Sequence, residues 1–164
     1  MKLKEPLKIV PVSDIPKAKD VPLESLMDIF RLCTKMEKIC DENDGIGLSA
    51  VQVGVPWNLF IVKRNRHFEY YVNCEYTGHG DKIKSVEGCL SLRNEDGTFR
   101  RFEVERFSKT RIKGKQLVVS GMPSLVLNDV DREEINLFSI VFQHECDHSR
   151  DVLVSQIGRE VELA

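Results

Sequence analysis

The stretch that most constrains the fold is "DREEINLFSIVFQHECDH", residues 131 to 148. It opens with Asp131 three residues before Glu134, a spacing typical of a helix capping box. An apolar stripe at helical spacing follows, formed by Ile135, Phe138, Val141, Phe142 and Cys146. We therefore predict a largely buried helix from about residue 131, with the polar run "QHECDH" late on it.

Most of the remaining segments resemble strands rather than helices. Short aromatic and β-branched runs are "WNLFIVKR", "FEYYVNCEYTGHG", "TFRRFEVERF", "TRIKGKQLVVSG" and "SLVLNDV", with turn-like Gly78 and Gly80 among them. One earlier segment, "PLESLMDIFRLCTKMEKICDEND", has the spacing of an amphipathic helix. Because strands and helices do not alternate, a parallel α/β sheet is disfavoured. We expect one α+β domain over residues 1–164, with antiparallel strands packed around the late helix.

Composition excludes several classes of protein. The chain has 164 residues, a net charge of -2 and a charged share of 30%, which suggests one soluble domain and no strongly polyanionic partner. Pro11 and Asp14 interrupt the apolar start, and no segment approaches the roughly 18 apolar residues of a membrane span. We expect a cytoplasmic monomer with no membrane contact.

The five cysteines do not resemble a disulfide framework, because their number is odd and they are widely spread. Cys33 and Cys40 lie about two helical turns, or about 10 Å, apart, which favours core packing over a redox pair. Cys146 is turned about 200° from His144 around the late helix, so it should also pack.

The pattern His-Glu-x-x-His is a candidate metal site. His144 and His148 are four residues apart, which places them one turn apart on the same helix face, and Glu145 lies beside them. The alternative is an ordinary helix with two satisfied polar histidines. A catalytic site of the zinc type would need a third ligand and an open position for water.

The third ligand has few candidates. Cys89 stands in "SVEGCLSL" among small and polar neighbours, with Gly88 allowing a close backbone approach. His67 and His79 lie in polar stretches where nothing nearby completes a shell, so we expect them at the surface.

The stretch "DGIGLSAVQVG" could contribute to a site. Its two glycines permit close backbone approach to a ligand, and the amide of Gln52 could donate to a developing oxyanion. The alternative is a turn with a surface or capping glutamine. Ala50 at the third position gives it the wrong form for a dinucleotide fingerprint.

Together, "GIGLSAVQ", "EGCLS" and "QHECDH" resemble the three signature motifs of the peptide deformylase family, over residues 45 to 148. Only the first departs, with Ser49 where the family usually has alanine. The resemblance implies an α+β metalloenzyme that removes the formyl group from the formyl-methionine of new polypeptides. It also implies that the ion lowers the pKa of its bound water toward about 7, giving a hydroxide that attacks the formyl carbon.

The resemblance assigns roles to particular residues. It implies that Cys89, His144 and His148 are the metal ligands and that Glu145 is the general base and then the acid. Gln52 and the backbone N–H of Leu90 would stabilise the oxyanion. The implied substrate-binding residues are Gly45, Ile46, Gly47, Glu87, Gly88, Ile140 and Val141, of which Glu87 also helps to fix the site; for Ile140 and Val141, plain core packing is an alternative.

The identity of the metal depends on which reasoning is used. The ligand chemistry alone favours Zn²⁺, whereas the family resemblance implies Fe²⁺, with Zn²⁺, Ni²⁺ or Co²⁺ as replacements. Two rival functions are a zinc peptidase of another kind and a non-catalytic relative that only binds peptides or ribosomes. The presence of Glu145 and Gln52 speaks against the second.

The chain departs from the family pattern at several places. Arg93 replaces an expected proline, and Ser149 and Asp151 replace an expected leucine and glycine. One of Arg100, Arg101 and Arg106 would contact the peptide, or all three are solvated strand residues.

Two further expectations concern ribosome contact. The basic region 98–115 could dock to the ribosome or be a solvated sheet face. With 16 residues after His148, the resemblance predicts no long C-terminal helix.

Overall fold

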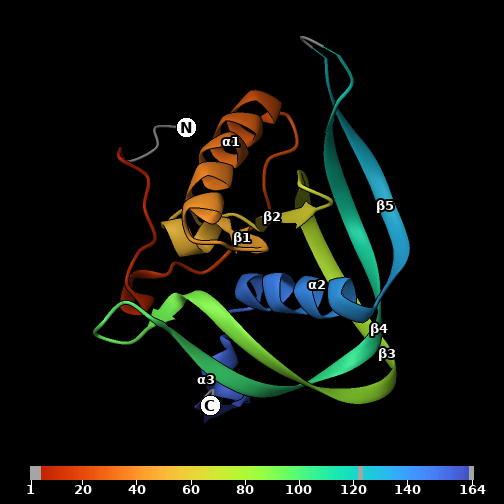
Figure 1. The fold of residues 1–164 in the computed structure, drawn as a ribbon. Coiled ribbons are helices and arrows are strands. Elements are labelled where there is room, and N and C mark those ends of the chain that lie inside the picture. Colours follow the sequence, from red (N-terminus) through yellow and green to blue (C-terminus); the bar gives the residue numbers. More distant parts are fainter. Residues whose placement is uncertain (1–4, 122–123, 163–164) are drawn as a thin grey trace.

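The computed structural model describes residues 5–121 and 124–162, and in it antiparallel strands surround one central helix (Figure 1). The helices are α1 (Leu26–Glu42), α2 (Asn136–Ser149) and α3 (Val154–Ile157), with single 3-10 turns at Val12–Asp14 and Ala50–Val53. The strands are β1 (Gly47–Ser49), β2 (Leu59–Arg64), β3 (His67–Arg93), β4 (Phe99–Val119), β5 (Leu125–Ile135) and β6 (Arg159–Val161). The predicted α+β class and the buried late helix are confirmed.

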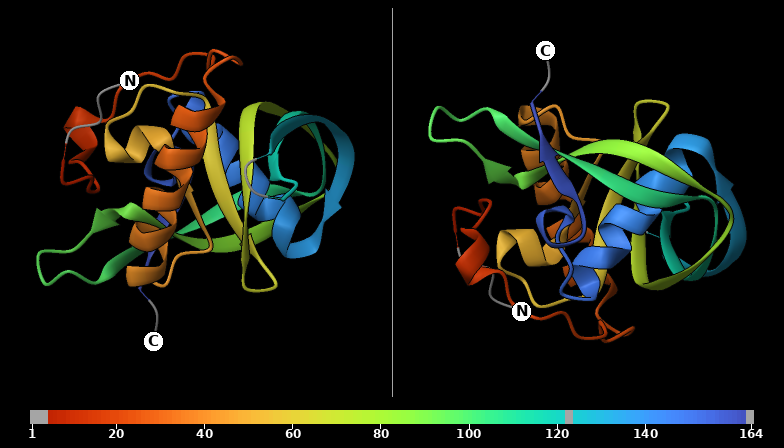
Figure 2. Two further views of the ribbon diagram at one scale, coloured as in Figure 1. Left: turned by 90° about the horizontal axis from the view of Figure 1, so that it is seen from above. Right: turned by 90° about the horizontal axis from the view of Figure 1, so that it is seen from below.

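The strands form one antiparallel sheet in the order β1-β2-β3-β4-β5, and β6 pairs with β4. β3 and β4 form a long twisted ribbon whose pairing runs from Tyr70 with Leu117 to Arg93 with Phe99. Figures 1 and 2 show this ribbon passing beneath α2 and rising beside it, with α1 and β1 on the other side of the helix. The sheet therefore surrounds α2. Because of this arrangement, side chains of α2 point toward β1 and β3.

The predicted breaks at Gly78 and Gly80 are wrong, because both residues lie within β3. Gly80 has a φ of +76° at an irregularity in the pairing between His79 and Lys82. A Cβ at Gly78 would come within 1.9 Å of the Phe107 ring. These glycines bend the strand and admit a ring, and they do not end the strand. The two strands predicted from residues 98 and 110 onward are one continuous strand, β4, because Lys109 between them pairs with both β3 and β5.

The predicted start of the late helix is also wrong. α2 begins at Asn136, and residues 131 to 135 belong to β5, where Asp131 pairs with Lys113 and Glu134 with Thr110. The Glu134 carboxylate accepts hydrogen bonds from Arg64 and Arg132 instead of capping a helix. Pairing with β4 satisfies the backbone of this segment, so the local capping signal is overridden.

The apolar core has two main parts. One lies between α1 and strands β1 to β3, and it contains Cys33 and Cys40; the other is an aromatic cluster around Phe60, Tyr71 and Phe142 that contains Cys146. All five cysteines are free and buried, which confirms the packing role predicted for these three. Within the described residues, no helix combines the length and the apolar character that a membrane crossing requires.

Candidate active site

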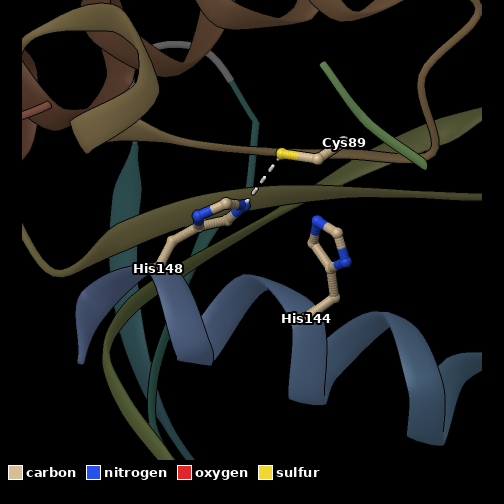
Figure 3. Close-up of side chains that lie close together, drawn as sticks. All are labelled: Cys89, His144 and His148. Atoms are coloured by element: carbon tan, nitrogen blue, oxygen red, sulfur yellow. Dashed lines mark hydrogen bonds between the residues drawn. The ribbon is translucent and has the colours of Figure 1, made fainter. Parts of the chain in front are cut away.

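Three candidate metal ligands meet where β3 passes α2. His144 and His148 rise from one face of α2 toward Cys89 (Figure 3), and their ring centroids are 5.0 Å apart. Cys89 Sγ lies 3.6 Å from His148 Nε2, and the three ligand atoms all lie within 4.8 Å of one another. Within residues 5–121 and 124–162, this is the one group of three such side chains gathered closely enough to hold an ion.

The local backbone explains why these residues meet. The four-residue spacing on α2 stacks the two histidines, as the sequence predicts. Cys89 lies in an irregular stretch of β3, between the pairs Gly88 with Arg101 and Arg93 with Phe99. Such an irregularity re-aims a side chain, here toward α2.

The chemistry of the three side chains fits a divalent metal ion. Burial raises the pKa of the Cys89 thiol, but the charge and hydrogen bonds of His148 and His144 outweigh it and hold that pKa well below its usual value. A thiolate and two imidazoles in a buried position are ligands that Zn²⁺ and similar ions prefer. His148 Nδ1 is buried without a partner among the described residues, so this ring makes its polar contact through Nε2.

His144 is oriented by a buried carboxylate. Its Nδ1 lies 2.9 Å from Glu87 Oε2, which leaves Nε2 directed to the ligand cluster. Arg106 donates two hydrogen bonds to Glu87, of 2.8 and 2.9 Å. Burial raises the pKa of Glu87, but the hydrogen bonds from Arg106 and His144 outweigh burial and bring it to about 2. Glu87 is therefore an anion that holds the His144 ring in place.

Arg106 is buried, so the solvated-strand alternative is wrong for this residue. It is 2% exposed and also donates to Asp147 Oδ2 at 2.6 Å, while the Tyr76 hydroxyl donates to Asp147 Oδ1 at 2.9 Å. Arg106 and Asp147 are 41 positions apart in the chain, so only the packing of α2 on β4 brings them together. The sequence contained no signal that distinguished Arg106 from its exposed neighbours.

Glu145 lies beside the ligands and is 3% exposed. Burial is the largest influence on this carboxyl and raises its pKa, although the nearby histidines and a hydrogen bond from Ser49 oppose the rise. The Ser49 hydroxyl lies 3.0 Å from Glu145 Oε2. This serine is also the N-terminal neighbour of the short turn that carries Gln52.

Gln52 is buried, and its amide is held in one orientation. Its Oε1 accepts the Ser49 backbone N–H at 2.9 Å, a capping contact that turns Nε2 toward the site. Nε2 then donates to Ser91 Oγ at 3.0 Å and lies 3.3 Å from Cys89 Sγ. Oε1 of Gln52 therefore makes the capping contact of the first hypothesis, and Nε2 is the hydrogen-bond donor of the second. Ser91 is a partner that sequence reasoning missed.

A cavity of about 470 Å³ opens onto these groups. It is lined by all seven predicted substrate-binding residues and by Gln52, Cys89, Leu90, His144 and Glu145. Lining residues that the sequence did not indicate are Asn43, Asp44, Ser85, Val86, Phe99 and Leu137. These come from the ends of α1, β3, β4 and α2, and their convergence depends on the path of the long ribbon.

Among the three candidate arginines, Arg101 alone lines this cavity. Its Nη1 would meet a Cβ at Gly88 within 2.7 Å, so the bare glycine leaves room for the guanidinium. Arg100 instead donates two hydrogen bonds to Glu160 of β6. Of the three candidates, Arg101 is therefore the one with its side chain at the cavity.

The remaining predicted surface groups lie away from the cavity. His67 is exposed, and His79 Nε2 lies 2.6 Å from a carboxylate oxygen of Glu133 on β5. In the basic region 98–115, Arg111 pairs with Asp131 and Lys115 with Asp129. These acidic partners on β5 offset the positive charge, which favours the sheet-face interpretation of the region.

Residues 15–160 match the model of the polypeptide deformylase family. The chain belongs to this family. A peptide deformylase of Phenylobacterium zucineum is 32% identical over 150 residues, covering 85% of this chain and 81% of that protein. The structure of a peptide deformylase of Plasmodium falciparum in complex with an inhibitor is 26% identical to this chain, with a TM-score of 0.71. The similarity covers 92% of this chain and 88% of that one. The structure of a plant peptide deformylase is 26% identical to this chain, with a TM-score of 0.76, and the similarity covers 96% of this chain and 83% of the plant chain.

Membership in the polypeptide deformylase family makes this chain an enzyme that removes an N-terminal formyl group. The resemblance drawn from the three motifs is confirmed by the match over nearly the whole chain. This result disfavours a peptidase of another kind. The presence of Gln52 and Glu145 at the cavity speaks against a non-catalytic relative.

Proposed function

We propose that this deformylase is a metal-dependent hydrolase in which Cys89, His144 and His148 hold the ion and Glu145 moves the proton. The observation that carries the proposal is the close grouping of Cys89, His144 and His148. This group lies beside one cavity, which is lined by Cys89, His144, Glu145 and Gln52. A divalent ion bound there would acidify water and polarise the formyl oxygen. We expect Fe²⁺, with Zn²⁺, Ni²⁺ or Co²⁺ as replacements, in a single catalytic domain.

Proton transfer and oxyanion stabilisation would be carried out by groups of this protein. Glu145 would take a proton from the attacking water and pass it to the leaving amine. Burial raises the pKa of the Glu145 carboxyl, which favours its holding a proton between the two transfers. Gln52 Nε2 and the backbone N–H of Leu90 would donate to the oxyanion that develops on the formyl oxygen.

The cavity suits an extended peptide that begins with formyl-methionine. Gly45, Ile46 and Gly47 at the start of β1, and Glu87 and Gly88 of β3, all line the cavity, so a peptide could add there as a strand. Ile140 and Val141 would contact the methionine side chain, and Arg101 would contact the peptide further along. We propose that the substrates are nascent polypeptides met by a monomer in the cytoplasm. Ribosome docking through residues 98–115 remains a prediction, which a steep loss of ribosome binding with salt would support.

Removing the metal should abolish activity. We expect that treating the anaerobically prepared protein with a chelator reduces formate release from a formyl-methionyl tripeptide to background, and that Fe²⁺ restores it. The measurement is formate released per minute beside the metal content per chain. Full activity in protein shown to be free of metal would contradict the assignment of Cys89, His144 and His148.

Replacing Gln52 with alanine should slow turnover by about a hundredfold, because one oxyanion donor is lost. The metal content should stay unchanged, since Gln52 is not a ligand. The change also leaves the Ser49 N–H without an acceptor, so assays belong well below the unfolding temperature of the variant. Gln116→Ala on β4, which does not line the cavity, is the control. Unchanged turnover in Gln52→Ala would remove this residue from the mechanism.

A further inference from the structure

The hydroxyl of Ser49 contacts the proposed general base directly. Ser49 is 1% exposed, and its Oγ lies 3.0 Å from Glu145 Oε2 and 3.1 Å from the Glu145 backbone oxygen. Both partners are acceptors, and a hydroxyl has one proton to donate. The carboxylate is the stronger acceptor because it is charged, so the proton is best placed on Oε2.

The geometry of β1 distinguishes the two oxygens of the Glu145 carboxylate. Gly47 and Ser49 are two residues apart on this strand, so they face the same side, toward α2. A Cβ at Gly47 would lie 2.5 Å from Glu145 Oε1, so the absent side chain leaves space for that oxygen. Gly47 lines the cavity, whereas Ser49 does not. Oε2 is therefore held on the buried side and Oε1 is presented beside the cavity.

We propose that Ser49 is a positioning residue, whose hydroxyl anchors Oε2 so that Oε1 of Glu145 is the oxygen that exchanges protons with the reacting groups. This inference rests on the proposed role of Glu145. Ser49 departs from the alanine that the family usually has at this place in the first motif, so the contact with Glu145 is not one that the family resemblance implies.

The same residue organises both side chains that flank the ligands. The backbone N–H of Ser49 fixes Gln52, and the side chain of Ser49 fixes Glu145. A substitution that deletes the Ser49 hydroxyl removes only the contact with Glu145, because the backbone N–H that fixes Gln52 stays. The effect of the hydroxyl on Glu145 can therefore be measured separately from the orientation of Gln52.

The test compares Ser49→Ala, Ser49→Thr and Ser49→Val, each assayed with its metal content counted. Thr and Val have nearly the same shape, so strain from the extra methyl group is common to both and only Thr keeps a hydroxyl. At a pH where kcat no longer changes, we expect kcat of Ser49→Ala to fall about tenfold while KM and metal content are unchanged. Ser49→Thr should exceed Ser49→Val by a similar factor.

Two further measurements separate this inference from the proposed function. In crystals of zinc-loaded Ser49→Ala, the Glu145 carboxylate should take more than one orientation. In a Glu145→Gln background, Ser49→Ala should cause no further loss. If Glu145→Gln is inactive but Ser49→Ala equals the wild type and keeps one carboxylate orientation, the positioning role is overturned alone. If Glu145→Gln retains full activity, the proposed base and the role of Ser49 are overturned together.

Discussion

Glu145→Gln is expected to lower formate release by about a thousandfold while the protein keeps its metal. The amide has nearly the shape of the carboxylate but cannot accept a proton from water, so proton transfer is lost and the fold is retained. Cys89, His144 and His148 are unchanged in this variant, so its metal content should equal that of the wild type. The measurement is kcat for a formyl-methionyl tripeptide, made with anaerobic protein of known metal content.

A matched control makes this result specific. Glu75→Gln changes the charge of the chain equally, but Glu75 is exposed on β3 and does not line the cavity, so its activity should be unchanged. If Glu145→Gln turns over at the rate of Glu75→Gln, another group must move the proton. If Glu145→Gln loses its metal, the loss of activity would reflect the ligand site and not proton transfer.

The second large effect is expected on stability. Arg106→Met should lower the free energy of unfolding by about 3–5 kcal/mol, because it leaves the carboxylates of Glu87 and Asp147 buried without their cation. Urea unfolding of metal-free protein at pH 7 measures this without a contribution from metal binding. The variant should also bind metal about 10- to 100-fold more weakly, since Glu87 would no longer be fixed against His144.

The effect of Arg106→Met should depend on pH in a defined direction. Glu87 has a folded-state pKa of about 2 against an ordinary value of 4.5, so its stabilising contribution is complete above about pH 4.5 and is lost as the pH falls toward 2. The stability difference between wild type and variant should therefore narrow over that window. Arg111→Met breaks an exposed ion pair on the same strand and should lower the free energy of unfolding far less than Arg106→Met does. Equal costs for the two variants would show that the buried network contributes no more than a surface pair.

The sequence was sufficient where a local spacing decides the geometry. The four-residue interval of His144 and His148 and the stripe of α2 follow from the helix period, so the candidate ligand pair and the buried helix were predictable. The apolar spacing of α1 was decided in the same way, and with it the packing of Cys33 and Cys40. The three motifs indicated Cys89 and Gln52 as candidates and predicted the family; the match over residues 15–160 confirms the family.

Tertiary structure decided what depends on contacts between distant segments. Pairing with β4 turned residues 131 to 135 into strand against their capping signal, and the glycines of β3 bent the strand where isolated turns were expected. Arg106 became a buried partner of Glu87, while its neighbour Arg101 reached the cavity. Ser49 came to hold Glu145 across 96 positions of sequence. Local periodicity carries no information about such partners, because a side chain's neighbours across a sheet are set by register and by the path of the whole ribbon.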